Sequence, residues 1–464
     1  MFQAKVGMAR AVASLSRASG RGGGTTLPGR LLLALEPDAI GRLATGLRRG
    51  SAVISATNGK TTTAKMAASI LSPPLHLTRN AAGANLASGI ASALVRDHDA
   101  DLGVFEVDEA ALEGVAGGLR PGVVVLGNLF RDQLDRYGEL ELIAARWRTT
   151  CDRLPGSTAL LSNADDPLVA SIGRELPAHT WFGLDDPSVA LPEMQHASDS
   201  KWCVRCGARY AYRSVYLGHL GDWACPSCGD ARPALDVAAR DIEPEGLDAI
   251  RFRLCTPVGE APVRLPLPGL YNVYNALAAA TLALQVGAGL DQVRDGLERF
   301  SAAFGRFERV ALGDVEAVLL LVKNPAGANE VIRTLAADGR PKALLVALND
   351  RIADGRDVSW IWDVDFELLA AQAGTVVCTG TRAAEMAMRL KYADVPEARI
   401  DVQPDMAAAV ERASAAATGE AYLLATYTAM LELRGLLEQR GLVQPYWQEA
   451  ARPACASRTC IRST

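Results

Sequence analysis

The chain has 464 residues, of which 49% are apolar and 22% are charged, and its formal net charge is −5. This length and composition favour a globular protein of about two or three domains. No run of about 18 apolar residues is present, which excludes a membrane-spanning helix. The slightly acidic balance gives no reason to expect a nucleic-acid partner.

Residues 1–45 are basic and mildly amphipathic, and we expect them to form an N-terminal arm. The arm lacks the apolar segment and the small-residue cleavage site of a secretory signal. Two closely spaced cysteine pairs in a long chain favour metal binding over a disulfide framework, and hence a reducing compartment. We therefore predict a cytoplasmic protein. The alternative is peripheral contact of the arm with the inner face of the membrane.

Between residues 46 and 302, short apolar runs alternate with helical patterns. Four predicted strands lie in the segments SAVISA, DLGVFEVDEA, PGVVVLGNLF and STALLSNADD. This alternation predicts an α/β domain with a doubly wound, mostly parallel sheet. Ligands of such a sheet bind at the carboxyl ends of its strands, where the acidic and amide residues of this sequence fall.

A predicted phosphate-binding loop follows the first strand. Such a loop gathers backbone N–H groups at the start of a helix, with a lysine beside them. Lys60 is expected to reach the β- and γ-phosphates of ATP, Thr61 to ligate Mg²⁺, and Gly59 to let the backbone approach closely. The predicted cofactor-binding residues of the loop are Thr57, Asn58, Gly59, Lys60, Thr61 and Thr62.

Ala56 stands where the usual pattern of such a loop has glycine. If this position needs a positive φ, alanine costs about 1 kcal/mol relative to glycine. We expect the substitution to weaken ATP binding modestly. The alternative is an ordinary strand-to-helix turn that holds no nucleotide.

Three acidic residues, Glu106, Asp108 and Glu109, end the second predicted strand. Clustered carboxylates are costly unless a cation lies among them. We predict that Glu106 shares a magnesium ion with Thr61, while the roles of the other two stay open. The alternative is a solvated strand end.

The segment 198–234 interrupts the α/β alternation and is predicted to be an inserted module. It contains two CxxC pairs separated by 18 residues, a spacing typical of a zinc ribbon. Four thiolates complete a tetrahedral shell, so the zinc is expected to be structural. The predicted ligands are Cys203, Cys206, Cys225 and Cys228. Nucleic-acid binding by this module is the alternative, which its few basic residues disfavour.

A second, smaller α/β domain is predicted over residues 303–442, followed by a flexible tail at 443–464. Four strand patterns alternate with helices in this domain. The segment LNDRIADGRDVSWIWDVDFE is its densest group of acidic residues. Asp357 in this segment has two open interpretations, a functional carboxylate or part of a turn or helix cap before VSWIWD.

Five motifs in order resemble those of the Mur ligases and folylpolyglutamate synthetases: TNGKTT, NLFRDQLDRYGE, LLSNADDPL, GLYNVYNALAAA and FGRFE. The resemblance implies a Mur-ligase-type ATPase fold. It also implies that Asn272 and Asn275 flank the adenine, that Arg306 binds phosphate, and that Asn163 and Asp165 lie near the nucleotide. Two departures are present. The histidines of two family motifs are absent, and the segment that opens the C-terminal domain is altered at residues 321–325.

The Cys₄ insertion and the segments KNPAGANE and DGRDVSW resemble one branch of this family, the synthetase subunits that amidate lipid II. The resemblance implies that ATP activates the α-carboxylate of D-Glu in the stem peptide as an acyl phosphate. Ammonia then gives D-isoglutamine. The implied partner is a separate GatD-type glutaminase, whose catalytic histidine Asp357 would orient. The implied catalytic residues are thus Asp357, Lys60 and Glu106.

Two other functions stay open on the sequence. One is a stand-alone ligase that adds an amino acid. The other is a non-catalytic regulator that binds a nucleotide and zinc.

Overall fold

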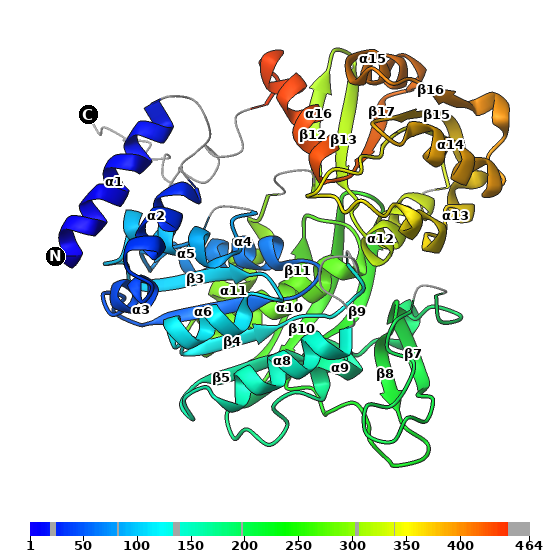
Figure 1. Ribbon diagram of the computed structural model, residues 1–464. Helices are drawn as coiled ribbons and strands as arrows, with labels where there is room; N and C mark the ends of the chain where they lie inside the picture. Colours follow the sequence, from blue (N-terminus) through cyan, green and yellow to red (C-terminus); the bar gives the residue numbers. More distant parts are fainter. Residues whose placement is uncertain are drawn as a thin grey trace, which may run out of the picture.

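The computed structural model describes residues 1–18, 25–80, 83–132, 140–195, 198–301, 306–337 and 339–443 (Figure 1). The predicted tail from residue 444 onward lies outside these residues, and so does the side chain of Arg306. Two sheets organise the described chain, which confirms the predicted α/β fold with a second domain. Both sheets are mainly parallel, and a separate two-stranded sheet lies beside the first (Figure 1).

The first sheet has nine strands, and the strand that leads into the phosphate loop lies inside it. Strand β1 pairs in parallel with β3 on one side and β4 on the other, so the chain order reverses there. Such a reversal opens a crevice at the carboxyl ends of the strands. In spatial order the strands are β11 (Gly259–Leu265), β10 (Ala249–Thr256), β9 (Val237–Glu245), β6 (His179–Leu184), β5 (Ala159–Asn163), β4 (Val123–Leu126), β1 (Ser51–Ser55), β3 (Leu102–Val107) and β2 (Leu77–Thr78).

Apolar side chains of β1 are buried on both faces of this sheet. Ala52 and Ile54 belong to one core cluster, whereas Val53 belongs to the other. Burial on both faces explains the unbroken apolar run of the sequence. The helices of this domain are α4 (Lys60–Leu71), α5 (Ala87–Arg96), α6 (Leu112–Leu119), α8 (Leu140–Asp152), α9 (Pro167–Ala170), α10 (Leu270–Gln285) and α11 (Leu290–Glu298), with a 3₁₀ turn, η1 (Pro187–Val189).

In the N-terminal region, residues 1–18 and 25–45 contain helices that cover α5. Val6, Ala9 and Leu32 are buried in one cluster with Ile90 and Leu94 of α5. These helices lie at the blue end of the chain in Figure 1. They are α1 (Phe2–Ala18), α2 (Leu27–Leu35) and α3 (Ala39–Ala44).

The second sheet has six strands and forms the C-terminal domain (Figure 1). Its strands, in spatial order, are β12 (Arg306–Leu312), β13 (Val315–Leu321), β17 (Glu420–Ala425), β14 (Lys342–Ala347), β15 (Ala373–Thr379) and β16 (Ile400–Val402). Its helices are α12 (Pro325–Ala336), α13 (Glu367–Ala370), α14 (Ala383–Tyr392), α15 (Met406–Ala416) and α16 (Tyr427–Gln439), with 3₁₀ turns η2 (Ser359–Asp363) and η3 (Glu397–Arg399).

The cysteine-rich module contains an antiparallel hairpin of β7 (Ala211–Leu217) and β8 (Leu220–Ala224). The hairpin stands beside the first sheet (Figure 1). Within the part of the chain that the structure describes, no helix has the length and apolar character needed to cross a bilayer.

Candidate active site

The phosphate loop connects β1 to α4, as the sequence predicts. Gly59 occupies the N-cap of α4 with a φ of +91°, and a Cβ atom there would lie 1.9 Å from Oδ1 of Asn275. Only glycine fits this conformation and this contact. Ala56, by contrast, is not among the residues with positive φ. The expected cost of alanine at this position therefore does not arise, and Ala56 is simply buried beside Gly127.

Asn128, which the sequence analysis did not single out, fixes the shape of this loop. Its Oδ1 accepts a hydrogen bond from the Asn58 N–H at 2.9 Å, and its Nδ2 donates to the Asn58 carbonyl at 3.1 Å. Thr57 is held similarly, because its N–H donates to the Asn128 carbonyl at 2.8 Å and its hydroxyl accepts from the Phe130 N–H at 3.0 Å. The sequence signal that could have identified Asn128 is a polar residue two positions after the buried strand β4.

Lys60 of the loop forms a buried ion pair with Glu109, which follows strand β3. Its Nζ lies 2.7 Å from Oε2 of Glu109, and both side chains are buried. Burial alone would raise the pKa of Glu109, but the positive charges of Lys60 and Lys323 hold this pKa below its ordinary value. The structure thus places Glu109, rather than Glu106, in direct contact with the loop lysine.

Glu106 is buried behind the loop and does not line the cleft, whereas Asp108 and Glu109 do. Its Oε1 accepts a hydrogen bond from the Gly83 N–H at 3.0 Å. Its Oε2 is buried without a hydrogen-bond partner within the described ranges. A buried carboxylate oxygen without a donor fits a cation ligand.

A cleft of about 410 Å³ lies over the phosphate loop and between the two domains. Asn58 and Asn324 connect its two sides, with Asn324 Nδ2 donating to Asn58 Oδ1 at 3.0 Å. Asn324 also caps α12 by accepting from the Gly327 N–H at 2.9 Å. An ion pair between Lys323 and Asp132 makes a second connection. The cleft therefore brings the loop lysine and the C-terminal domain to one ligand-sized space.

Among the other predicted nucleotide-binding residues whose side chains the structure describes, Asn275 alone lines this cleft, next to Tyr271 of the same helix. Asn272 turns away, since its Nδ2 donates to the Pro268 carbonyl at 2.7 Å and its Oδ1 accepts from Asn275. Asn163 is buried at the end of β5, where its Oδ1 accepts from the Asp165 N–H at 3.1 Å.

Asp165 is the centre of a buried hydrogen-bond network outside the cleft lining. Its carboxylate accepts from Arg232 at 2.9 Å, from the Tyr274 hydroxyl at 2.7 Å and from the Leu184 N–H at 2.9 Å. Burial raises the pKa of Asp165 to about 6, against the opposing charge of Arg232. This network joins the cysteine-rich module, which carries Arg232, to the sheet and to α10.

We expect Asp165→Asn to destabilise the fold by up to about 3–5 kcal/mol, because the largely buried guanidinium of Arg232 loses its nearest carboxylate and keeps only Asp222, 3.6 Å away. Chemical denaturation would measure the loss. Asp236→Asn provides a control, since that carboxylate also accepts a backbone hydrogen bond, from Trp181, but at a more exposed position. If Asp165→Asn unfolded like the wild type but bound ATP poorly, the carboxylate would belong to the nucleotide site instead.

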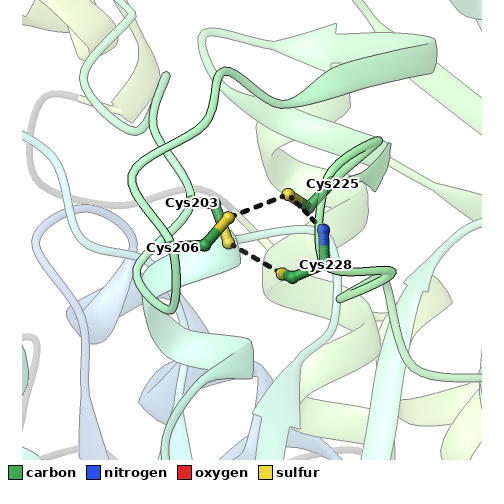
Figure 2. A group of neighbouring side chains, drawn as sticks. All are labelled: Cys203, Cys206, Cys225 and Cys228. Carbon is green, nitrogen blue, oxygen red and sulfur yellow. Dashed lines mark hydrogen bonds between the residues drawn. The ribbon is translucent and has the colours of Figure 1, made fainter.

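The four clustered cysteines converge on one point (Figure 2). Their sulfur atoms all lie within 4.8 Å of one another, with Cys206 and Cys225 at 3.4 Å and Cys203 and Cys228 at 3.6 Å. Tetrahedral zinc with Zn–S bonds of about 2.3 Å separates its sulfur ligands by roughly 3.8 Å. The geometry therefore fits a Cys₄ metal site.

The backbone also supports two metal-binding knuckles. Gly207 and Gly229, which follow the second cysteine of each pair, have φ values of +74° and +73°. Each donates its N–H to the carbonyl of the first cysteine in its pair, at 2.8 Å and 3.1 Å respectively. The Cys228 N–H points to the Cys225 sulfur at 3.5 Å and lowers the pKa of Cys225, which favours the thiolate that a metal requires.

Asp357 is exposed and lies just before η2. Its Oδ1 accepts from the Ser359 N–H at 2.8 Å. This hydrogen bond lowers the pKa of Asp357, so the side chain is a carboxylate at neutral pH. The local hydrogen bond fits a turn just before η2, whose N-cap is Val358, while the exposure and the charge leave the carboxylate open to a second protein.

Comparisons with known proteins agree with this architecture. The Mur ligase middle domain matches residues 54–205, and the MurT ligase C-terminal domain matches residues 321–430. A pseudomurein peptide ligase type C from Methanothermus fervidus shares the fold with a TM-score of 0.65 and 23% identity, over 85% of this chain and 79% of that one. MurF from Thermotoga maritima, solved with ADP, has a TM-score of 0.62 and 14% identity, over 88% of this chain and 85% of that one.

Fold and site together define a ligase of the Mur type, a class that depends on ATP and Mg²⁺. The match to curated relatives is more specific. The lipid II isoglutaminyl synthase (glutamine-hydrolyzing) subunit MurT of Streptococcus pneumoniae is 33% identical over 91% of this chain and 94% of its own length. The corresponding subunit of Staphylococcus aureus N315 is 32% identical over 86% of this chain and 89% of its own. The chain belongs to the MurT family.

Proposed function

We propose that this protein is the synthetase subunit of a glutamine-dependent lipid II isoglutaminyl synthase. It activates the α-carboxylate of D-Glu in the stem peptide with ATP, and ammonia converts the activated group into the amide of D-isoglutamine. The near full-length match to the MurT subunits is the observation that carries this proposal. The cleft between the phosphate loop and the C-terminal domain supports it.

The proposed reaction has two steps, and the site has to stabilise negative charge on the transferred phosphoryl group. An oxygen of the α-carboxylate attacks the γ-phosphorus of ATP, and ADP leaves as the acyl phosphate forms. Ammonia then attacks the acyl carbon, inorganic phosphate leaves, and a proton is lost to give the neutral amide. Lys60 and the backbone N–H groups at the start of α4 stabilise negative charge on the transferred phosphoryl group. A magnesium ion would neutralise further phosphate charge, held by Thr61 and by the carboxylate oxygen of Glu106 that lacks a donor.

The ammonia is proposed to come from a GatD-type glutaminase subunit. Glutamine hydrolysis needs an activated cysteine thiolate. Burial raises the pKa of both Cys151 and Cys378 to about 12, and the pKa of Cys255 is also raised by burial. Outside the Cys₄ cluster, the described part of the chain therefore offers no reactive thiolate, which supports a nucleophile on a second chain.

The surface near Asp357 has the character of a docking site for that second chain. Trp362 in η2 and Met388 and Tyr392 in α14 are exposed, with the Trp362 and Tyr392 rings 5.7 Å apart. Exposed aromatic residues beside a free carboxylate are typical of protein interfaces. We place the glutaminase there, with Asp357 orienting its catalytic histidine.

Reconstitution tests the proposal directly. The chain with a GatD-type glutaminase, Mg²⁺, ATP, glutamine and lipid II should release ADP and amidate D-Glu. The chain alone should do the same when an ammonium salt replaces glutamine. Incorporation of an amino acid instead of ammonia would show a stand-alone ligase. ATP binding without carboxylate-dependent ADP release would show a regulator.

The cysteine cluster is proposed to hold one structural zinc ion. Its hairpin reaches the active site, because Leu217 and Leu220 line the cleft and Gly218 lies against the ring of Phe130. Such a closed Cys₄ site stabilises a fold instead of catalysing a reaction. The zinc would thus hold one wall of the nucleotide site in place.

We expect the purified chain to contain one zinc ion, and Cys203→Ser to lower both the zinc content and the affinity for ATP. Elemental analysis and calorimetric titration with ATP would measure the two quantities. Cys255→Ser provides the control, since that cysteine lies outside the cluster. Full zinc content in Cys203→Ser would contradict the assignment of this cysteine as a zinc ligand. An ATP affinity that stayed unchanged after complete loss of zinc would contradict the role of the zinc ion in supporting the nucleotide site.

A further inference from the structure

Part of the cleft has apolar and aromatic walls contributed by three separate segments. They are the tip of the β7–β8 hairpin, the start of α10 and the C-terminal domain. A flat aromatic group is the ligand that such walls accommodate best. The lining side chains of this part include Leu217, Leu220, Leu267, Tyr271, Phe307 and Val331.

Glu330 contributes a carboxylate to this apolar part of the cleft. It lines the cleft from α12 and is only 2% exposed. Its Oε2 lies 2.5 Å from Nη2 of Arg333. Its Oε1 is buried and has no hydrogen-bond partner within the ranges that the structure describes. A buried acceptor without a donor is rare in native proteins and calls for a missing partner.

The position of Glu330 is fixed from both sides. Arg333, which pairs with it, donates from Nη1 to the Tyr216 carbonyl of the hairpin at 3.0 Å. One turn of α12 earlier, Gly327 lies beside Asn324, which contacts the phosphate loop. The carboxylate is therefore held at a set place relative to the phosphate loop, as recognition of one edge of a ligand requires.

We infer that Glu330 reads the base of the nucleotide, with its free Oε1 accepting a hydrogen bond from the exocyclic amino group of adenine. The inference rests on the proposed ATP site. The aromatic and aliphatic side chains of the cleft pack against the two faces of the base, and Glu330 supplies a hydrogen-bond acceptor at its edge. Burial raises the pKa of Glu330, the charge of Arg333 opposes this rise, and the ion pair with Arg333 orients the carboxylate. Glu330 is thereby a specificity-determining residue for the nucleotide.

The test compares ATP with purine riboside triphosphate, which lacks only the amino group, by calorimetric titration in the presence of Mg²⁺. The wild type should bind ATP about 10-fold to 100-fold more tightly than the analogue, as expected for a hydrogen bond to a charged acceptor. Glu330→Gln should reduce this ratio at least about 5-fold, because the acceptor loses its charge. Glu367→Gln should keep the wild-type ratio, since Glu367 also pairs with an arginine, Arg389, but lies outside the cleft lining.

The outcomes separate the possible roles. A purely structural Glu330, which only holds Arg333 against the hairpin, would make Glu330→Gln weaken both ligands equally and leave the ratio unchanged. That result would overturn the inference about Glu330, and so would equal affinity of the wild type for ATP and the analogue. Neither result would contradict the proposed ATP site. Failure of the wild type to bind ATP would overturn the proposed function and this inference with it.

Discussion

Replacing Lys60 with methionine should lower the rate of ADP release at least about 10³-fold. The side chain supplies a full positive charge at the transferred phosphoryl group, and the loss of even one neutral donor in comparable sites costs about 10²–10³-fold in rate. The assay uses ammonium as the nitrogen source, so that the result does not depend on the glutaminase. A rate within about fivefold of the wild type would contradict the role given to Lys60.

A second variant separates catalysis from folding. Lys60 is the ion-pair partner of the buried Glu109, so its removal leaves this carboxylate with only the positive charge of Lys323 nearby and would destabilise the fold by up to about 3–5 kcal/mol. The double variant Lys60→Met/Glu109→Gln removes both charges and should recover most of this stability in thermal unfolding. It should remain inactive, because the positive charge at the phosphates is still missing.

The phosphate loop was predictable from sequence because its chemistry is local. The order of Gly59, Lys60 and Thr61 after an apolar strand determines where the backbone N–H groups and the ammonium group lie. The Cys₄ geometry was predictable for the same reason, since each CxxC pair makes its own knuckle. The cost expected at Ala56 was wrong because φ at this position is not positive, a property that residue identity alone does not fix.

Contacts between residues that lie far apart in the chain explain which features of the site could not be predicted from the sequence. Asn163 ends a strand and Asp165 follows it, as ligand-binding residues often do, but Arg232 of the cysteine-rich module pairs with the Asp165 carboxylate. Glu330 lies in the interior of α12, far along the chain from the loop, and nothing local marks its carboxylate as part of the cleft. Strands β9 to β11 were missed although Arg251, Phe252, Arg253 and Leu254 alternate between exposed and buried positions.

Asp357→Asn should abolish glutamine-dependent amidation by the reconstituted pair and leave ammonium-dependent amidation intact. A carboxylate that orients a catalytic histidine also stabilises the charged imidazolium, and its replacement by asparagine costs about 10⁴-fold in a Ser-His-Asp triad. The synthetase site is a separate centre with its own ligands, so ADP release driven by ammonium should stay within about twofold of the wild type. Both activities would be measured on the same preparation of the two chains.

The choice of asparagine decides between the two interpretations of Asp357. Asparagine keeps the oxygen that accepts from the Ser359 N–H, and its side chain forms such turns as aspartate does. If the turn before η2 were the whole role, Asp357→Asn would be silent and Asp357→Ala would not. If the charge serves the partner's histidine, both variants should lose the glutamine-dependent activity. Asp401→Asn, which removes a surface carboxylate paired with Arg412 on the same domain, should affect neither activity.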